Sequence, residues 1–175
     1  ELFGKKLDAE ALCAVGDKIG ADVPLCIKGG TLYSITSGDM IAAECDTNCV
    51  FVCIYPDFTL STAEAYAKYD ENPTEINPHY ADFVSSIVCG SLSEGAGFIS
   101  NVFTEIYHDS RIEEMKNDLL ESGAVISEMT GSGSVVFGVF EREETAVDAK
   151  NILSGKYPHV FTTRPVNCGV YVLER

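Results

Sequence analysis

The greater part of the sequence predicts an α+β fold built on a ferredoxin-like, or split βαβ, sheet. From residue 49 onward the patterns run strand, helices, strand, strand, helix, strand. Glycine, serine and asparagine punctuate the runs between these elements, as turns require. That order is typical of a sheet that carries its helices on one face.

Composition limits the classes of partner. The chain has 175 residues, 46% of them hydrophobic, and a net charge of −15. This length can bury a core and allows one domain, or one domain and part of another. Only 12 lysines and arginines are present, so nucleic acid is not an expected partner. No apolar run approaches the ~20 residues of a membrane helix, so no membrane partner is expected.

The cysteines do not predict a metal site. Three of them recur four residues apart, at Cys45, Cys49 and Cys53, but no Cys-x-x-Cys pair occurs. Cys49 and Cys53 lie in an apolar run, where a free cysteine behaves as a small hydrophobe. Seven cysteines are an odd number and too sparse for a disulfide scaffold. We therefore expect reduced thiols and a cytoplasmic location.

The first 45 residues predict a helix over residues 7–19, which Asp8 caps and Gly20 ends. Its apolar stripe is spaced every four residues, at Leu7, Ala11, Val15 and Ile19. Pro24 favours an extended Val23, which leaves Asp22 in a bend between this helix and a strand. Strands are then expected over residues 25–28, 31–36 and 40–43.

A polar break at residues 46–48 predicts the main boundary, with domains at 1–45 and 46–175. The strands expected in the second domain are 49–55, 124–129, 134–140, 159–163 and 169–173. One expected helix begins at Ser61 or Thr62, and the others run over residues 80–89, 96–108, 109–122 and 143–153. The expected apolar faces of the last two consist of Ile112, Met115, Leu119 and Leu120, and of Ala146, Ala149 and Leu153. The sequence starts at Glu1 without a methionine, so we expect a piece of a longer protein or a trimmed chain.

Asp22 is the best candidate for a catalytic group. An ionised aspartate can accept a proton from a hydroxyl. A position just past a helix C-terminus disfavours an anion, which implies a hydrogen bond in the turn or a cationic partner. The alternative is a turn residue that only stops the helix.

Two further motifs allow both a functional and a structural interpretation. Residues 130–134 read Thr-Gly-Ser-Gly-Ser, and successive amides in such a loop can bind anionic oxygens; the alternative is a simple hairpin turn. Residues 56–66 place hydroxyls and an aromatic ring after a strand, where Thr62 and Tyr66 can contact a polar ligand. The alternative there is capping by Ser61 or Thr62 and packing by Tyr66.

Taken in order, these motifs resemble the latter part of a GHMP-superfamily kinase. They are Gly-Ala-Asp-Val-Pro at residues 20–24, Ser-Thr-Ala-Glu-Ala-Tyr at 61–66 and Met-Thr-Gly-Ser-Gly-Ser at 129–134. The similarity runs from residue 1 to about 165. The similarity is greatest to the members of this superfamily that act in the non-mevalonate isoprenoid route. Those members phosphorylate the 2-hydroxyl of 4-diphosphocytidyl-2-C-methyl-D-erythritol.

The resemblance implies roles for the matching positions. Asp22 falls where the family has its catalytic base. Thr62 and Tyr66 fall in the region that holds the substrate, a cytidyl diphosphate sugar alcohol. Gly131, Ser132 and Gly133 fall in a loop near the phosphates. ATP and Mg²⁺ are the implied cofactors, and no residue is offered as a metal ligand.

The sequence also departs from the family. It contains neither the lysine that pairs with the catalytic aspartate nor the Pro-x-x-x-Gly-Leu-Gly-Gly-Gly-Ser-Ser type loop that holds ATP. Residues 1–45 then correspond to the end of the first domain, and the missing N-terminal portion becomes the expected partner. We expect no kinase activity from this chain alone. Another GHMP small-molecule kinase and a non-catalytic ferredoxin-like binding module remain alternatives.

Overall fold

The computed structural model describes residues 7–34, 41–43, 48–71, 73, 79–89 and 92–170. The chain divides into two units, which we call the terminal unit (residues 1–45 and 165–175) and the sheet unit (Asp46–Arg164). The sequence predicts a second domain that continues to residue 175, whereas the contacts group Pro165 and the residues after it with the terminal unit. Each unit is described by itself.

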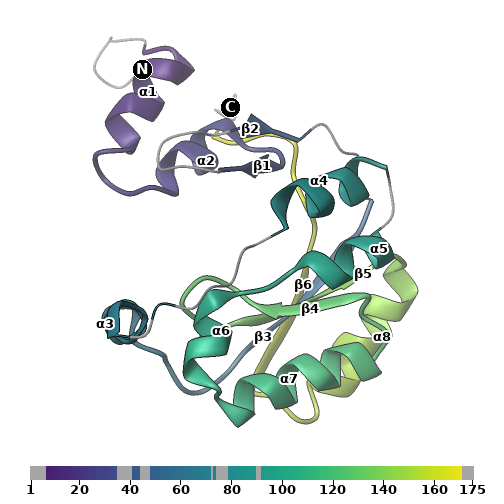
Figure 1. Cartoon of the computed structure of the whole chain (residues 1–175). Helices are drawn as coiled ribbons and strands as arrows, with labels where there is room; N and C mark the ends of the chain where they lie inside the picture. Colours follow the sequence, from purple (N-terminus) through teal and green to yellow (C-terminus); the bar gives the residue numbers. More distant parts are fainter. Residues whose placement is uncertain are drawn as a thin grey trace. The chain divides into compact units, whose positions relative to one another are not determined.

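The sheet unit is built on a four-stranded antiparallel sheet in the order β4-β5-β3-β6 (Figure 1). Its strands are β3 (Val50–Tyr55), β4 (Ile126–Met129), β5 (Val136–Phe140) and β6 (His159–Thr163). Phe51 at the centre pairs with Val139 of β5 and with Thr163 of β6. This order, with helices between the first and second and between the third and fourth strands, confirms the predicted ferredoxin-like fold.

Two helices cover one face of this sheet: α7 (Ser110–Glu121) on β4 and β5, and α8 (Glu143–Leu153) on β3 and β6. The stripe of α7 consists of Ile112, Met115 and Leu119, each no more than 1% exposed. Leu120, which the sequence places on the same face, is 45% exposed. It follows Leu119 by one residue, about 100° around the helix, and so points away from the sheet.

The opposite face of the sheet is partly covered as well, so the expectation of helices on one face only is wrong. Residues of α4 (Tyr80–Val88), α5 (Leu92–Gly95) and the 3₁₀ turn η1 (Ala96–Phe98) pack against Ile126 and Val139. The physical reason lies in β3, whose apolar residues alternate between both faces. Val52 belongs to the core under α7 and α8, and Phe51 belongs to the other cluster.

The helix at the start of the chain is shorter than predicted. Helix α1 (Ala9–Gly16) begins after Asp8, whose side chain accepts a hydrogen bond from the Ala11 N–H, as expected of its cap. It ends at Gly16, because the N–H groups of Ile19 and Gly20 both turn back to the Gly16 carbonyl. The predicted stripe is also largely exposed: Val15 is 53% and Ile19 77% exposed.

The predicted strand over residues 25–28 is wrong, because these residues form helix α2 (Val23–Lys28). Pro24 lies in its first turn, where the missing N–H is not needed. A short apolar run does not distinguish a strand from a helix. Strands β1 (Leu32–Tyr33) and β2 (Ile41–Ala42) then pair antiparallel.

The chain returns to the terminal unit after β6 and crosses the end of α2. The Gly30 N–H donates to the Val166 carbonyl over 3.2 Å. A β-carbon at Gly29 would overlap the backbone of Cys168, and one at Gly169 would overlap that of Ile27. The two segments therefore touch backbone to backbone. The predicted strand at 169–173 falls mostly outside the described residues.

Acid should weaken the start of α7. The Asp109 carboxylate accepts hydrogen bonds from the Arg111 side chain and backbone, and the Arg111 side chain lowers the pKa of Asp109. A carboxyl with a lowered folded-state pKa stabilises the fold above its unfolded pKa of about 3.9 and stops doing so as pH falls through the folded value. Asp109→Ala should cost about 1 kcal/mol near neutral pH. Urea titrations of both proteins between pH 7 and 2.5 check this: the cost should shrink toward the acid end, and a cost that grows as the pH falls would contradict it.

Candidate functional site

The loop after β4 lies against the segment after β3, which brings two of the predicted motifs together. The hydroxyls of Thr62 and Ser132 share a hydrogen bond of 2.8 Å. The Ser134 hydroxyl donates to the Phe58 carbonyl over 2.6 Å. Two sequence regions about 70 positions apart therefore form one surface of the sheet unit.

We call residues 130–134 the glycine loop. Both of its glycines occupy conformations that favour glycine. Gly133 has φ +92°, and a β-carbon there would lie 2.7 Å from Met129 Sδ and 2.8 Å from Leu60 Cδ1. Gly131 has φ +56° and nothing within 4 Å of that position. Gly133 thus lets the loop pack closely, whereas Gly131 lies at its exposed side.

The backbone donors of the loop are used unequally. The Thr130 N–H donates to the Val135 carbonyl, and the Gly133 N–H donates to the Thr130 carbonyl. Within the described ranges, the N–H groups of Gly131 and Ser132 have no hydrogen-bond partner. Successive unpaired amides beside a serine hydroxyl can donate to an anionic oxygen.

The predicted substrate residues lie on α3 (Thr62–Glu71). Ser61 caps this helix, because its hydroxyl accepts a hydrogen bond from the Glu64 N–H over 3.3 Å. Thr62 instead reaches Ser132, so capping does not account for its hydroxyl. The Tyr66 ring is 57% exposed and meets Phe103 edge to face at 5.1 Å. One face of that ring can therefore contact a ligand.

Asp22 belongs to the terminal unit and precedes the first residue of α2. It is exposed, and its side chain makes no capping hydrogen bond to the helix. The sequence places it past a helix C-terminus, which disfavours an anion, but the structure places it at the start of a helix of six residues. A carboxylate is favoured at that end of a helix, so the expected electrostatic penalty is absent.

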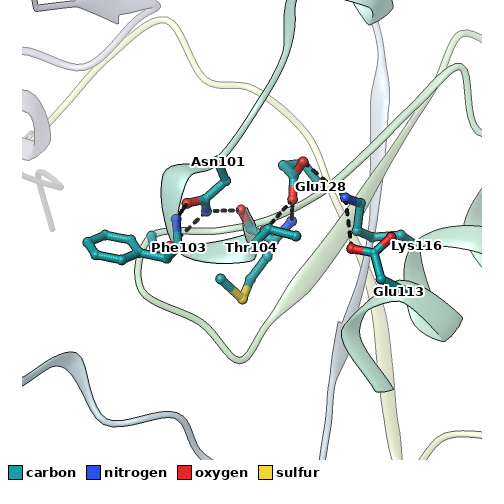
Figure 2. Close-up of polar contacts among 8 residues, drawn as sticks. Asn101, Phe103, Thr104, Glu113, Lys116 and Glu128 are labelled. Atoms are coloured by element: carbon teal, nitrogen blue, oxygen red, sulfur yellow. Dashed lines mark hydrogen bonds and ion pairs between the residues drawn. The ribbon is translucent and has the colours of Figure 1, made fainter. Parts of the chain in front are cut away.

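Sequence reasoning missed a polar network beside the loop, which Figure 2 shows. Asn101 caps α6 (Val102–Tyr107) and also donates to two backbone carbonyls of the Met129–Gly131 segment. Glu128, only 6% exposed, accepts a hydrogen bond from the Thr104 hydroxyl and pairs with Lys116. The sequence predicts one helix from about residue 96, which places Asn101 inside it, whereas the structure has the turn η1 and then α6 from Val102. The cap and its contact with a distant loop were therefore both missed.

The described residues contain no group of three or more His, Cys, Asp and Glu side chains that could hold a metal ion. Cys49 and Cys53 are buried, and burial raises the pKa of the Cys53 thiol. Cys45 lies outside the described residues. None of the described helices is long and apolar enough to cross a membrane.

Comparison with known proteins gives a family match and a set of relatives. Residues 101–159 match the family model "GHMP kinases C terminal". The chain is 31% identical, over 99% of its length, to 4-diphosphocytidyl-2-C-methyl-D-erythritol kinase of Caldanaerobacter subterraneus subsp. tengcongensis. It spans 61% of the length of that relative.

Solved structures share the fold. A homoserine kinase from Cytophaga hutchinsonii superposes with a TM-score of 0.79 at 17% identity, covering 96% of this chain and 61% of that one. A 4-(cytidine 5'-diphospho)-2C-methyl-D-erythritol kinase superposes with a TM-score of 0.68 at 17% identity, covering 92% and 58%. The solved structures thus share the fold of this chain, and within it residues 101–159 are identified as a C-terminal domain of the GHMP kinase family.

Proposed function

We propose that this chain is part of a kinase that transfers the γ-phosphate of ATP to the 2-hydroxyl of 4-diphosphocytidyl-2-C-methyl-D-erythritol, in the non-mevalonate route of isoprenoid biosynthesis. The observation that carries the proposal is the match, along 99% of the chain, to a relative named 4-diphosphocytidyl-2-C-methyl-D-erythritol kinase. The matched relative is longer than this chain. The activity is therefore proposed for a protein that also contains the N-terminal portion, which would complete the site.

In this proposal Asp22 accepts the proton of the 2-hydroxyl, while Thr62 and Tyr66 hold the substrate. Support for the substrate side comes from Thr62, whose hydroxyl lies at the glycine loop, and from the exposed Tyr66 ring, which suits stacking on cytosine. Phosphoryl transfer depends mainly on positioning and on stabilisation of charge. A base is needed to align and deprotonate the attacking hydroxyl.

The glycine loop fits a phosphate. The N–H groups of Gly131 and Ser132 have no partner in the described part of the chain, and the Ser132 hydroxyl lies beside them. ATP supplies the phosphoryl group to be transferred. We assign no Mg²⁺ ligand, because no metal-ligating cluster occurs among the described side chains; the ion is expected to arrive on the ATP phosphates.

A cytoplasmic location accords with this proposal. Cys13, Cys26, Cys53, Cys89 and Cys168 are free thiols, and free thiols persist where glutathione and thioredoxin keep cysteines reduced.

The substrate is tested with the full-length gene product. Coupled measurement of ADP release should show turnover with 4-diphosphocytidyl-2-C-methyl-D-erythritol and at most background rates with homoserine or mevalonate. Preference for homoserine or mevalonate would assign the protein to another GHMP kinase. No turnover with any acceptor, in a protein whose upstream sequence lacks a glycine-serine ATP loop, would instead support a binding module.

The chain of 175 residues should not phosphorylate the cytidyl substrate by itself. The lysine and the ATP-holding loop of the family are absent from its sequence, and the missing electrostatic stabilisation is the main contribution to phosphoryl transfer. The same coupled assay checks this, after circular dichroism has shown that the chain melts cooperatively. Release of ADP that depends on the cytidyl substrate would contradict the prediction.

A further inference from the structure

Asn101 uses every hydrogen-bonding group of its side chain. Its Nδ2 donates to the carbonyls of Met129 over 2.7 Å and Gly131 over 2.8 Å, and its Oδ1 accepts from the Phe103 N–H over 2.9 Å (Figure 2). Both carbonyls can only accept, so the amide group can face them in one orientation only. One side chain therefore caps α6 and holds the start of the glycine loop.

The helix that carries Asn101 is itself fixed to β4. Glu128 Oε1 accepts hydrogen bonds of 2.7 Å from the Thr104 hydroxyl and from the Met129 N–H. Glu128 Oε2 lies 3.2 Å from Lys116 Nζ. Glu128 is only 6% exposed, and a carboxylate so buried is stable only with partners of this kind. Asn101 thus projects from a rigid base.

The contact with Gly131 has a consequence for the next amide. The Gly131 carbonyl and the Ser132 N–H belong to the same peptide plane, and in a trans peptide they point in opposite directions. When Asn101 holds the carbonyl, it directs the Ser132 N–H away from α6. This N–H has no partner among the residues that the structure describes, so it is free to donate to a ligand.

We propose that Asn101 is a positioning residue for the glycine loop and orients the Ser132 N–H toward a phosphate oxygen of ATP. The inference rests on the proposed function for the identity of the anion. The geometry of the loop is independent of the proposed function. Asn101 itself touches no substrate in this proposal and acts through the Gly131–Ser132 peptide.

Asn101→Asp in the full-length protein separates this role from simple capping. The aspartate keeps an oxygen for the Phe103 N–H and caps as well as asparagine does, but it turns an acceptor toward two carbonyls. Asp109→Ala is the matched control, because it removes the cap of α7 and leaves the loop contacts intact. Its loss of stability shows what capping alone contributes.

Two measurements are made on each variant. In N101D the protected amides of Thr130 and Gly133 should exchange about tenfold faster, the change that the net loss of one to two hydrogen bonds produces. The KM for ATP should rise about tenfold, while the KM for the alcohol substrate stays within about twofold. D109A should leave both exchange and KM at wild-type values.

The outcomes separate the two proposals. If N101D matches D109A in loop exchange or in KM for ATP, the positioning role is overturned. If the wild-type protein has no kinase activity, the proposed function fails, and the exchange measurement still decides whether Asn101 holds the loop.

Discussion

Asp22→Asn in the full-length kinase is expected to lower kcat by about 10²- to 10⁴-fold, the usual contribution of a positioned general base. Asparagine has nearly the same shape but cannot accept a proton. Asp22 is exposed and its side chain makes no capping bond to α2. The substitution should therefore change the free energy of unfolding by no more than about 0.5 kcal/mol. Steady-state ADP release and urea unfolding measure the two effects separately.

Asp17→Asn is the matched control for this experiment. Asp17 is an exposed aspartate of the same unit, at the C-terminal end of α1, and has no assigned role in the reaction. It should keep wild-type kcat. The base assignment is wrong if D22N retains kcat within about threefold of D17N, since a proton acceptor contributes far more than that.

Gly133→Ala should lower the free energy of unfolding by about 3 kcal/mol. Its φ of +92° lies outside the regions that alanine adopts easily, which alone costs about 1–3 kcal/mol. The new β-carbon would also lie within 2.8 Å of side-chain atoms of Met129 and Leu60, which must shift. Urea unfolding of the full-length protein, followed by near-ultraviolet circular dichroism, gives the difference.

Gly131→Ala provides the control for backbone conformation without crowding. Its φ of +56° is left-handed, and nothing lies within 4 Å of the added carbon. A cost of about 1 kcal/mol is expected. Equal stabilities of the two variants would show that the close packing of Gly133 contributes nothing.

Elements with strong periodicity could be predicted from the sequence. Helix α8 (Glu143–Leu153) and strand β6 (His159–Thr163) have the predicted bounds. In α8 the expected stripe of Ala146, Ala149 and Leu153 is buried, because spacings of three and four residues define one helix face. Helix α2 could not be predicted, since its six residues are too few to show a period.

Some residues of the candidate site could be predicted from the sequence and others could not. Thr62 and Ser132 belong to motifs with recognisable chemistry, and the structure brings these two residues together. The role of Asn101 depends on carbonyl groups 28 and 30 positions away in the sequence. Every residue carries such a carbonyl, so no side-chain pattern marks the partner.

The backbone crossing between Gly29 and Gly169 constrains the order in which the chain can fold during synthesis. All residues of the sheet unit are contiguous, from Asp46 to Arg164, so its sheet can close as soon as β6 has left the ribosome. The terminal unit is assembled from both sides of that stretch. Helix α2 can pack on α1 early, but its contact with residues 166–169 can form only after the whole sheet unit has been translated.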